Sequence, residues 1–263
     1  MNALQCARVL GALVLVSTLW VSRISAQPLD QAAVGDLVAA NRILADQQVL
    51  DAFGHVSVRH PTNPQHFLMS RSLAPALVTA DDIVEYDFDG QALGSKPGFT
   101  HFLERFIHAE IFRRRPDVNS AIHSHAPAII PFANTQAQLK PMFHISSFLA
   151  PTVPVFDIRK AAGGPTNMLI GDGKLGKTLA ETLASNSVVL MRGHGYVAVA
   201  PSISLAVFRA IYTVTNARMQ ADAIALGGTV TFLDAEEAEK AGTVTDQVHT
   251  RAWELWKRKL DGK

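Results

Sequence analysis

The chain has 263 residues, of which 48% are hydrophobic and 18% charged, and its formal net charge is +1. This length suits one large domain or two small ones, and the composition supports a sizeable core and excludes a disordered chain. No long basic run is present, so nucleic acid is not a favoured partner.

The first 26 residues differ in character from the rest. Arg8 precedes the apolar run VLGALVLVSTLWV (9–21), and small residues follow up to Ala26. A short apolar core that ends at a small residue is typical of a secretory signal peptide, and this run is too short to span a bilayer comfortably. We predict a signal peptide at 1–26, a mature domain at 27–263 and export, to the periplasm of a bacterium, with no membrane span after cleavage. An uncleaved anchor and a misassigned start codon are the alternatives.

Cysteine is confined to the same segment. Cys6 is the only cysteine, so the mature chain has none. An exported protein of this kind is held by its core without disulfides, and only His, Asp and Glu are left as side chains for metal chemistry.

Helical and strand patterns alternate from residue 29 onward. Apolar residues at helical spacing predict a helix over 29–50 that ends at Phe53-Gly54. The alternation in HVSVRHP (55–61) then predicts a strand, HFLMS (66–70) and IVEYDFDG (83–90) are predicted as further strands, and Thr79–Asp82 is predicted as a turn or helix start.

The second half continues the alternation. The pattern predicts, in chain order, an amphipathic helix over 101–115, strands at 119–127 and 154–158, a helix over 174–185, a strand pair over 187–200, a long helix over 202–226 closed by Gly227-Gly228, and a last helix opened by a capping box at Asp234–Glu237. Neither a linker nor a repeat interrupts this series, which indicates one α/β domain.

Three histidines and one acid stand out along these elements. His123 and His125 are one residue apart in a predicted strand, where alternate side chains share a face. His194 lies between two glycines, which allow a sharp turn and a close approach to a ligand. Glu104 lies on the helix before the strand. Three imidazoles and a carboxylate suit zinc, manganese or iron. The alternative is an incidental set of core and surface residues.

The order of these parts resembles the class II aldolase/adducin family. The resemblance runs from about residue 30 to 245, and it is carried by GHVSVR (54–59), MSRSLAPALVTADDIVEYD (69–87), ERFIHAEIFRRRPDVNSAIHSHAP (104–127) and LMRGHGYVAVAPSISLAVFRAIYTVTNA (190–217). It implies a single-domain, three-layer α/β/α fold around a mixed, mostly antiparallel sheet. It also implies a homotetramer with active sites between subunits, and one divalent ion per subunit, held by Glu104, His123, His125 and His194.

Departures from the family's sugar-phosphate aldolases bear on the substrate. Those enzymes bind phosphate with a serine pair just before the glutamate, where this chain has Phe102 and Leu103. An apolar pair cannot solvate a phosphate dianion. His55 replaces a typical asparagine, and His144 takes the place of a tyrosine that often donates the proton. The motifs look closer to decarboxylases of hydroxylated aromatic or pyridine dicarboxylates.

The resemblance therefore predicts a metal-dependent carbon–carbon lyase for a small anionic substrate, with decarboxylation preferred over aldol cleavage. The predicted roles are Glu104 as general base, His144 or His55 as proton donor, and His108 as a supporting residue. Arg71 is expected to bind a substrate carboxylate together with Ser57 and Ser72, or else to form a surface salt bridge. An iron-dependent oxygenase, a non-catalytic adducin-like module and other enzyme chemistry, such as an epimerase, remain as alternatives.

Overall fold

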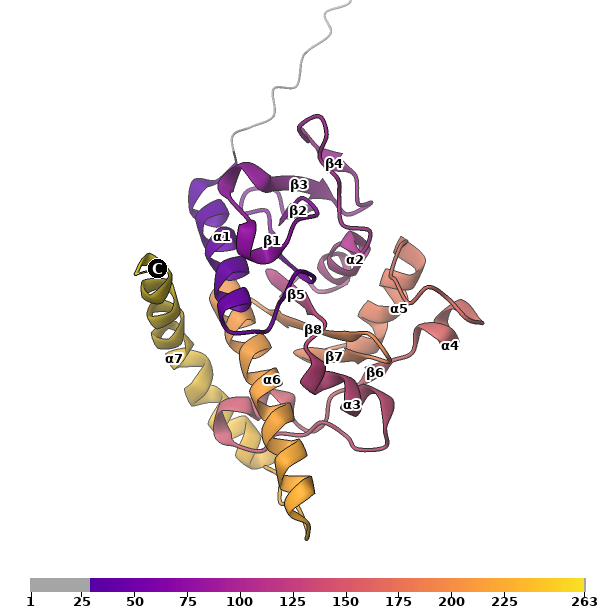
Figure 1. Cartoon of the computed structure of the whole chain (residues 1–263), viewed down its shortest axis with the longest axis vertical. Coiled ribbons are helices and arrows are strands. Elements are labelled where there is room, and N and C mark those ends of the chain that lie inside the picture. Colours follow the sequence, from indigo (N-terminus) through magenta and orange to yellow (C-terminus); the bar gives the residue numbers. More distant parts are fainter. Residues whose placement is uncertain (1–28, 263) are drawn as a thin grey trace, which may run out of the picture.

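The computed structural model describes residues 29–262 (Figure 1). The predicted signal peptide lies outside the described residues. Of the helices within 29–262, none combines the length and the apolar character that crossing a membrane requires.

One eight-stranded sheet forms the centre of the molecule. Its strand order is β4-β3-β2-β1-β5-β8-β7-β6, and every neighbouring pair is antiparallel except β6 and β7. The strands are β1 His55–Arg59, β2 His66–Ser70, β3 Ile83–Asp87, β4 Ala92–Leu93, β5 Ser120–Ser124, β6 Val155–Phe156, β7 Val188–Met191 and β8 Gly195–Ala200. The prediction of a mixed, mostly antiparallel sheet is confirmed.

Helices cover both faces of this sheet (Figure 1). They are α1 Gln31–Asp46, α2 Arg105–Arg114, α3 Ile130–Asn134, α4 Ile158–Ala162, α5 Gly173–Leu183, α6 Ile203–Leu226 and α7 Ala235–Asp261. One apolar core joins α1, α6 and α7 to residues such as Val56 and Ile122, and a second core joins α2 and α5 to residues such as Ala121 and Val197. Two cores on opposite faces of one sheet make three layers, as predicted.

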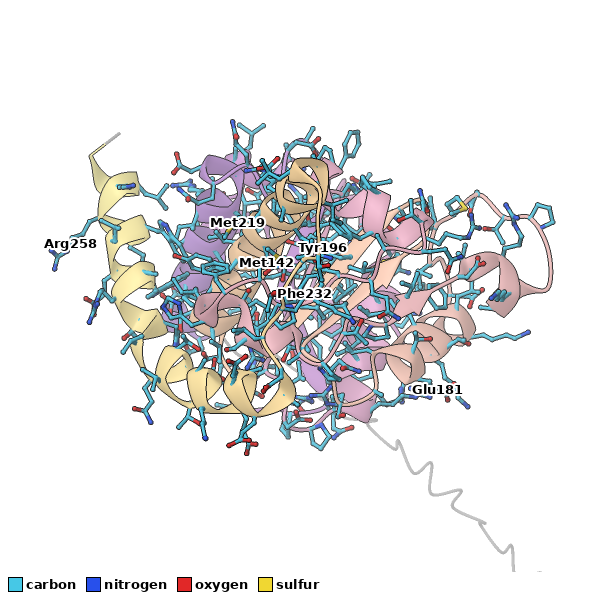
Figure 2. All side chains as sticks on the ribbon, turned by 90° about the horizontal axis from the view of Figure 1, so that it is seen from below. Met142, Glu181, Tyr196, Met219, Phe232 and Arg258 are labelled. Atoms are coloured by element: carbon cyan, nitrogen blue, oxygen red, sulfur yellow. The ribbon has the colours of Figure 1, made fainter. Side chains whose placement is uncertain are left out.

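The alternation of side chains along the strands separates the two cores. Val56 and Ile122 point toward α1 and α6, so their neighbours His55 and His123 point toward α2. Tyr196 lies in the interior, while Glu181 and Arg258 lie on the outside of α5 and α7 (Figure 2). The polar side chains at His55 and His123 therefore lie in the interior between the sheet and α2.

Local capping signals decide where several helices begin and end. The Asp234 carboxylate accepts from the Glu237 amide while the Glu237 side chain accepts from the Asp234 amide, so the predicted capping box is confirmed. Gly227 caps α6 with a positive φ of 79°, as predicted.

Two predicted helix boundaries were wrong. The first helix ends at Asp46 and not near residue 53, because Gln48 takes a positive φ of 57° and turns the chain toward β1. The helix predicted over 101–115 begins only at Arg105, because the Thr100 carbonyl accepts from the Ser72 amide and draws the preceding segment away from helical geometry. Glu104 is therefore the residue that precedes the first turn of α2.

Candidate metal centre

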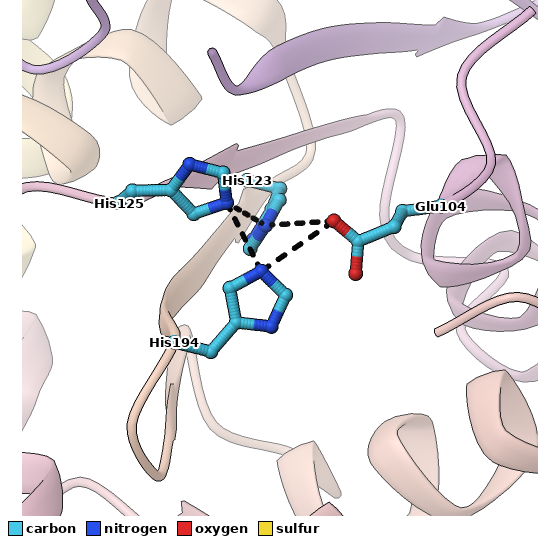
Figure 3. A group of neighbouring side chains, drawn as sticks. All are labelled: Glu104, His123, His125 and His194. Atoms are coloured by element: carbon cyan, nitrogen blue, oxygen red, sulfur yellow. Dashed lines mark hydrogen bonds and ion pairs between the residues drawn. The ribbon is translucent and has the colours of Figure 1, made fainter. Parts of the chain in front are cut away.

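Four side chains from distant parts of the chain meet at one point (Figure 3). Nε2 of His125 lies 2.9 Å from Nε2 of His123 and 3.0 Å from Nε2 of His194. Oε2 of Glu104 lies 3.5 Å from Nε2 of His123 and 3.5 Å from Nε2 of His194. All four atoms lie within 4.8 Å of one another, so the residues that the sequence singled out do converge.

Each of the four residues lies at or next to the end of a strand or helix. His123 is the fourth residue of β5, and His125 follows the last residue of that strand. His194 lies in the turn between β7 and β8, and Glu104 precedes α2. The predicted strand over 119–127 thus ends before His125, yet both imidazoles still reach the same point.

Gly195 makes the close approach of the β7–β8 turn to β5 possible. A Cβ atom at this position would lie 2.1 Å from the backbone oxygen of Ser124 and 3.1 Å from Cα of His125. Both neighbouring atoms are backbone and cannot swing away. Glycine is therefore required for His194 to lie beside His125.

Hydrogen bonds orient two of the four side chains. Nδ1 of His123 lies 3.0 Å from the Tyr196 carbonyl oxygen, which can only accept, so this nitrogen carries the proton and Nε2 presents its lone pair to the cluster. Oε1 of Glu104 accepts from the Ile170 amide at 2.9 Å, which leaves Oε2 facing the imidazoles. Sequence reasoning missed both partners, because neither uses its side chain.

The charges of the cluster suit a divalent cation. Burial alone would raise the pKa of Glu104, but its contacts with His123 and His194 outweigh burial and hold that pKa well below its usual range. Burial, together with His123 and His194, lowers the pKa of His125 to about 4. The ionised carboxylate of Glu104 therefore faces three imidazoles, whose Nε2 atoms lie 2.9 and 3.0 Å apart. A cation at their centre would satisfy the converging lone pairs, so the donor set fits a metal such as zinc.

A second polar cluster lies directly behind the first. Nδ1 of His55 lies 2.7 Å from Nε2 of His108, and Oγ of Ser57 lies 2.5 Å from Nδ1 of His108. The His55 ring also contacts the rings of His123 and Phe102, with centroid distances of 5.1 and 4.6 Å. Ser57 is fully buried and lies against His108, and its predicted contact with the substrate stays a prediction.

The buried imidazole of His108 predicts how the free energy of unfolding depends on pH in the acidic range. Burial, reinforced by His123, lowers the pKa of His108 to about 3, from an unfolded value of about 6.5. Between those values the unfolded chain binds a proton that the folded chain does not, so stability falls as pH falls. We expect His108→Gln to reduce the slope of unfolding free energy against pH by up to about 1.4 kcal/mol per pH unit in this window.

The measurement is urea unfolding of chelator-treated protein at several pH values from 4 to 8. Above pH 7 the two proteins should give parallel curves, because His108 is then neutral in both the folded and the unfolded state. Equal slopes between pH 4 and 6 would contradict the assignment.

Arg71 and Ser72 lie on the segment that follows β2. Nε of Arg71 donates to Oδ1 of Asp82 at 2.7 Å, and the guanidinium lies over the Phe99 ring. The salt bridge that the sequence allowed is therefore present. The Arg71 side chain remains 29% exposed, and its terminal nitrogens have no partner within residues 29–262. Ser72 is half-buried, and its amide donates to the Thr100 carbonyl.

His144 lies apart from both clusters. It is exposed and begins the 3₁₀ segment His144–Leu149, which packs against α6 and α7. A single chain therefore does not bring His144 to the group of Glu104, His123, His125 and His194.

A cavity of about 410 Å³ opens beside His125. It is lined by Ala45, Gln48, Val49, Leu50, Asp51, His125, Ala126 and Pro127. Most of these side chains are apolar, and Asp51 adds one carboxylate. Sequence reasoning did not select Asp51. Its position three residues before Gly54 in the GHVSVR motif is the one signal that could have pointed to it.

The chain is similar to several known proteins. The family model for the Class II Aldolase and Adducin N-terminal domain matches residues 35–221. Decarboxylase tropJ of Talaromyces stipitatus is 37% identical over 249 residues, which cover 87% of this chain and 94% of that protein. A 3,4-dihydroxyphthalate decarboxylase of Arthrobacter keyseri is 32% identical, covering 81% of this chain and 88% of its own.

A solved structure shares the fold. The L-fuculose 1-phosphate aldolase from Glaciozyma antarctica superposes with a TM-score of 0.72 and 24% identity, covering 88% of this chain and 90% of its own. The range matched by the family model includes all four residues of the cluster.

Proposed function

Because the chain belongs to the class II aldolase and adducin family, we propose that it is a metal-dependent carbon–carbon lyase that decarboxylates a small hydroxylated aromatic acid. The cluster of Glu104, His123, His125 and His194 is the observation that carries this proposal. Two relatives named as decarboxylases support the reaction type, and both matches extend over most of the chain.

One divalent ion per subunit would be held by the four residues of the cluster. Zinc is proposed first, with manganese or iron as the other candidates for three imidazoles and a carboxylate. Such an ion supplies Lewis acidity to a substrate oxygen next to the bond that breaks. Elemental analysis of the purified protein identifies the ion, and oxygen uptake during turnover would point to an iron oxygenase instead.

The residues of the chain then have separable tasks. In decarboxylation the bond between the ring carbon and the carboxylate carbon breaks, its electron pair stays on the ring, and a proton takes the place of carbon dioxide. Oε1 of Glu104 is anchored by the Ile170 amide, so Oε2, once released from the ion, could take up a proton from the substrate without breaking that hydrogen bond. We assign Glu104 as general base on this ground.

We propose that His144 donates the proton from a neighbouring subunit of a homotetramer. Its exposed position, apart from the cluster of its own chain, supports a role across a subunit interface. Light scattering tests the assembly, and a monomer with full activity would contradict it.

The segment before Glu104 argues against a phosphorylated sugar as substrate. Phe102 packs on the His55 ring, and Leu103 is 50% exposed. Neither side chain can donate a hydrogen bond to a phosphate dianion. We expect carbon dioxide release from hydroxylated benzoates or phthalates. Efficient cleavage of L-fuculose 1-phosphate, with the unphosphorylated sugar much poorer, would show an aldolase instead.

Arg71→Ala is expected to raise KM by about 10- to 100-fold if the free terminal nitrogens bind a substrate carboxylate, since a charged hydrogen bond contributes about 1.5–3 kcal/mol. Steady-state kinetics measure the change. Arg113→Ala is the control, because Arg113 also forms surface ion pairs, with Asp89 and Glu110. If Arg71→Ala lowers the melting temperature but leaves KM unchanged, Arg71 forms the salt bridge with Asp82 and does not bind the substrate.

We also propose export of the protein, on the strength of the apolar run at 9–21. The mature chain should begin at Gln27. Mass spectrometry of protein from the native host measures the N-terminus, and an intact Met1 on protein from the cytoplasmic fraction would contradict export.

A further inference from the structure

The hydrogen bonds behind the metal cluster form one continuous chain from Ser57 through His108 to His55. His55 and Ser57 are two residues apart on β1, so both side chains point toward α2, and His108 lies one helical turn after Glu104 on that helix. All three residues are buried. The two distances, 2.5 and 2.7 Å, leave no room for a water molecule between them.

The geometry sets the direction of donation along this chain. The Ser57 hydroxyl carries one proton, and within residues 29–262 its only other acceptor is the Ala121 carbonyl at 3.5 Å, beyond the usual range for a hydroxyl bond. The proton therefore points to Nδ1 of His108. A neutral His108 then carries its proton on Nε2 and donates to Nδ1 of His55. A neutral His55 must carry its own proton on Nε2.

Nε2 of His55 is the open end of the chain. No protein group within residues 29–262 hydrogen-bonds this nitrogen. The ring contacts the rings of His123, one of the four cluster residues, and of Phe102, in the segment just before Glu104. An N–H group on this ring would therefore lie close to a substrate held at the proposed metal centre.

We infer that Ser57 and His108 are positioning residues that hold His55 as a neutral imidazole with its proton on Nε2, so that His55 donates a hydrogen bond to an anionic oxygen of the substrate. This inference rests on the proposed function for the identity of the ligand, a hydroxylated aromatic carboxylate. It changes the role expected for His55 from a proton donor to a fixed hydrogen-bond donor. It also gives Ser57 a role that requires no contact with substrate.

The first test reads the tautomers directly. Proton–nitrogen correlation spectra of zinc-loaded, full-length protein with labelled histidines distinguish a ring protonated on Nε2 from one protonated on Nδ1, and His55→Gln and His108→Gln assign the signals. Both rings should show the Nε2 proton. A proton on Nδ1 of either ring would overturn the inference, whether or not the protein decarboxylates anything.

The second test removes the donor at the start of the chain. Ser57→Ala should give mixed tautomers at His55 and weaken binding of 2,3-dihydroxybenzoate, used as the probe, by roughly tenfold, the equivalent of about 1.4 kcal/mol. Zinc content should stay at the wild-type level. Ser57→Thr keeps the hydroxyl and should restore a single tautomer and binding to within about threefold.

Ser120→Ala is the matched control. Ser120 is as deeply buried as Ser57 and lies on the adjacent strand β5, but its hydroxyl donates to the Ser57 carbonyl and not to an imidazole. Its loss should leave the tautomers and probe binding unchanged. Equal weakening of binding by Ser57→Ala and Ser120→Ala would reduce Ser57 to a packing role and contradict the inference. Correct tautomers in a protein that releases no carbon dioxide would instead count against the proposed reaction alone.

Discussion

His123→Ala is expected to abolish metal retention and turnover together. His123 contributes the fully buried imidazole of the cluster, and the Tyr196 carbonyl fixes its Nε2 toward the other three residues. Alanine removes one of four converging donors and leaves a carbonyl without its partner in the interior. We expect metal content below about one-tenth of an equivalent and at least about 10³-fold lower kcat/KM, equivalent to about 4 kcal/mol.

Two further variants make the result interpretable. His125→Ala removes a partly buried imidazole that has no hydrogen bond to the backbone of residues 29–262, so it should lose the metal with a smaller loss of stability. His66→Ala is the control, because His66 lies on β2 and pairs with Glu85, outside the cluster. Full metal content and normal rates in folded His123→Ala protein would refute the assignment of the site.

Gly195→Ala is expected to produce the second large effect, through the backbone alone. The new methyl group would overlap the Ser124 carbonyl, so β8 could no longer lie against β5 at this point. Separation of the two strands also separates His194 from His125. We expect a loss of about 3 kcal/mol or more in unfolding free energy, together with loss of bound metal.

A second glycine provides the matched comparison. Gly35 lies inside α1, and a Cβ atom there would meet nothing within 4 Å. Gly35→Ala should therefore stabilise the protein by about 0.5–1 kcal/mol, because alanine is the better helix former. Chemical denaturation measures both variants. A Gly195→Ala protein with wild-type stability and metal content would show that the turn can relax at little cost.

The sequence by itself determined the type and order of most elements. The capping box at Asp234–Glu237, the glycine cap after α6 and the alternating sequence of β1 depend on residues within a few positions of one another. Such short-range preferences can be recognised from the sequence alone. The four cluster residues were likewise predicted, from the spacing of their motifs and the family resemblance.

Only the tertiary structure decided how the residues around the cluster are used. Ser57 and His108 are 51 positions apart, and their bond depends on how α2 packs across β1. No local pattern encodes that packing, so the sequence does not reveal the bond between Ser57 and His108. The start of α2 at Arg105 likewise depended on the remote bond between Ser72 and Thr100.

The same distinction explains the cluster itself. The sequence predicted which four side chains would meet, but the supports that aim them are the Tyr196 carbonyl, the Ile170 amide and the missing Cβ of Gly195. Every residue has the same backbone groups, so the sequence cannot reveal which of them will face a histidine or a glutamate. Their positions are set only when β5, β8 and α2 pack together, because hydrogen bonds between distant segments depend on strand register and helix placement.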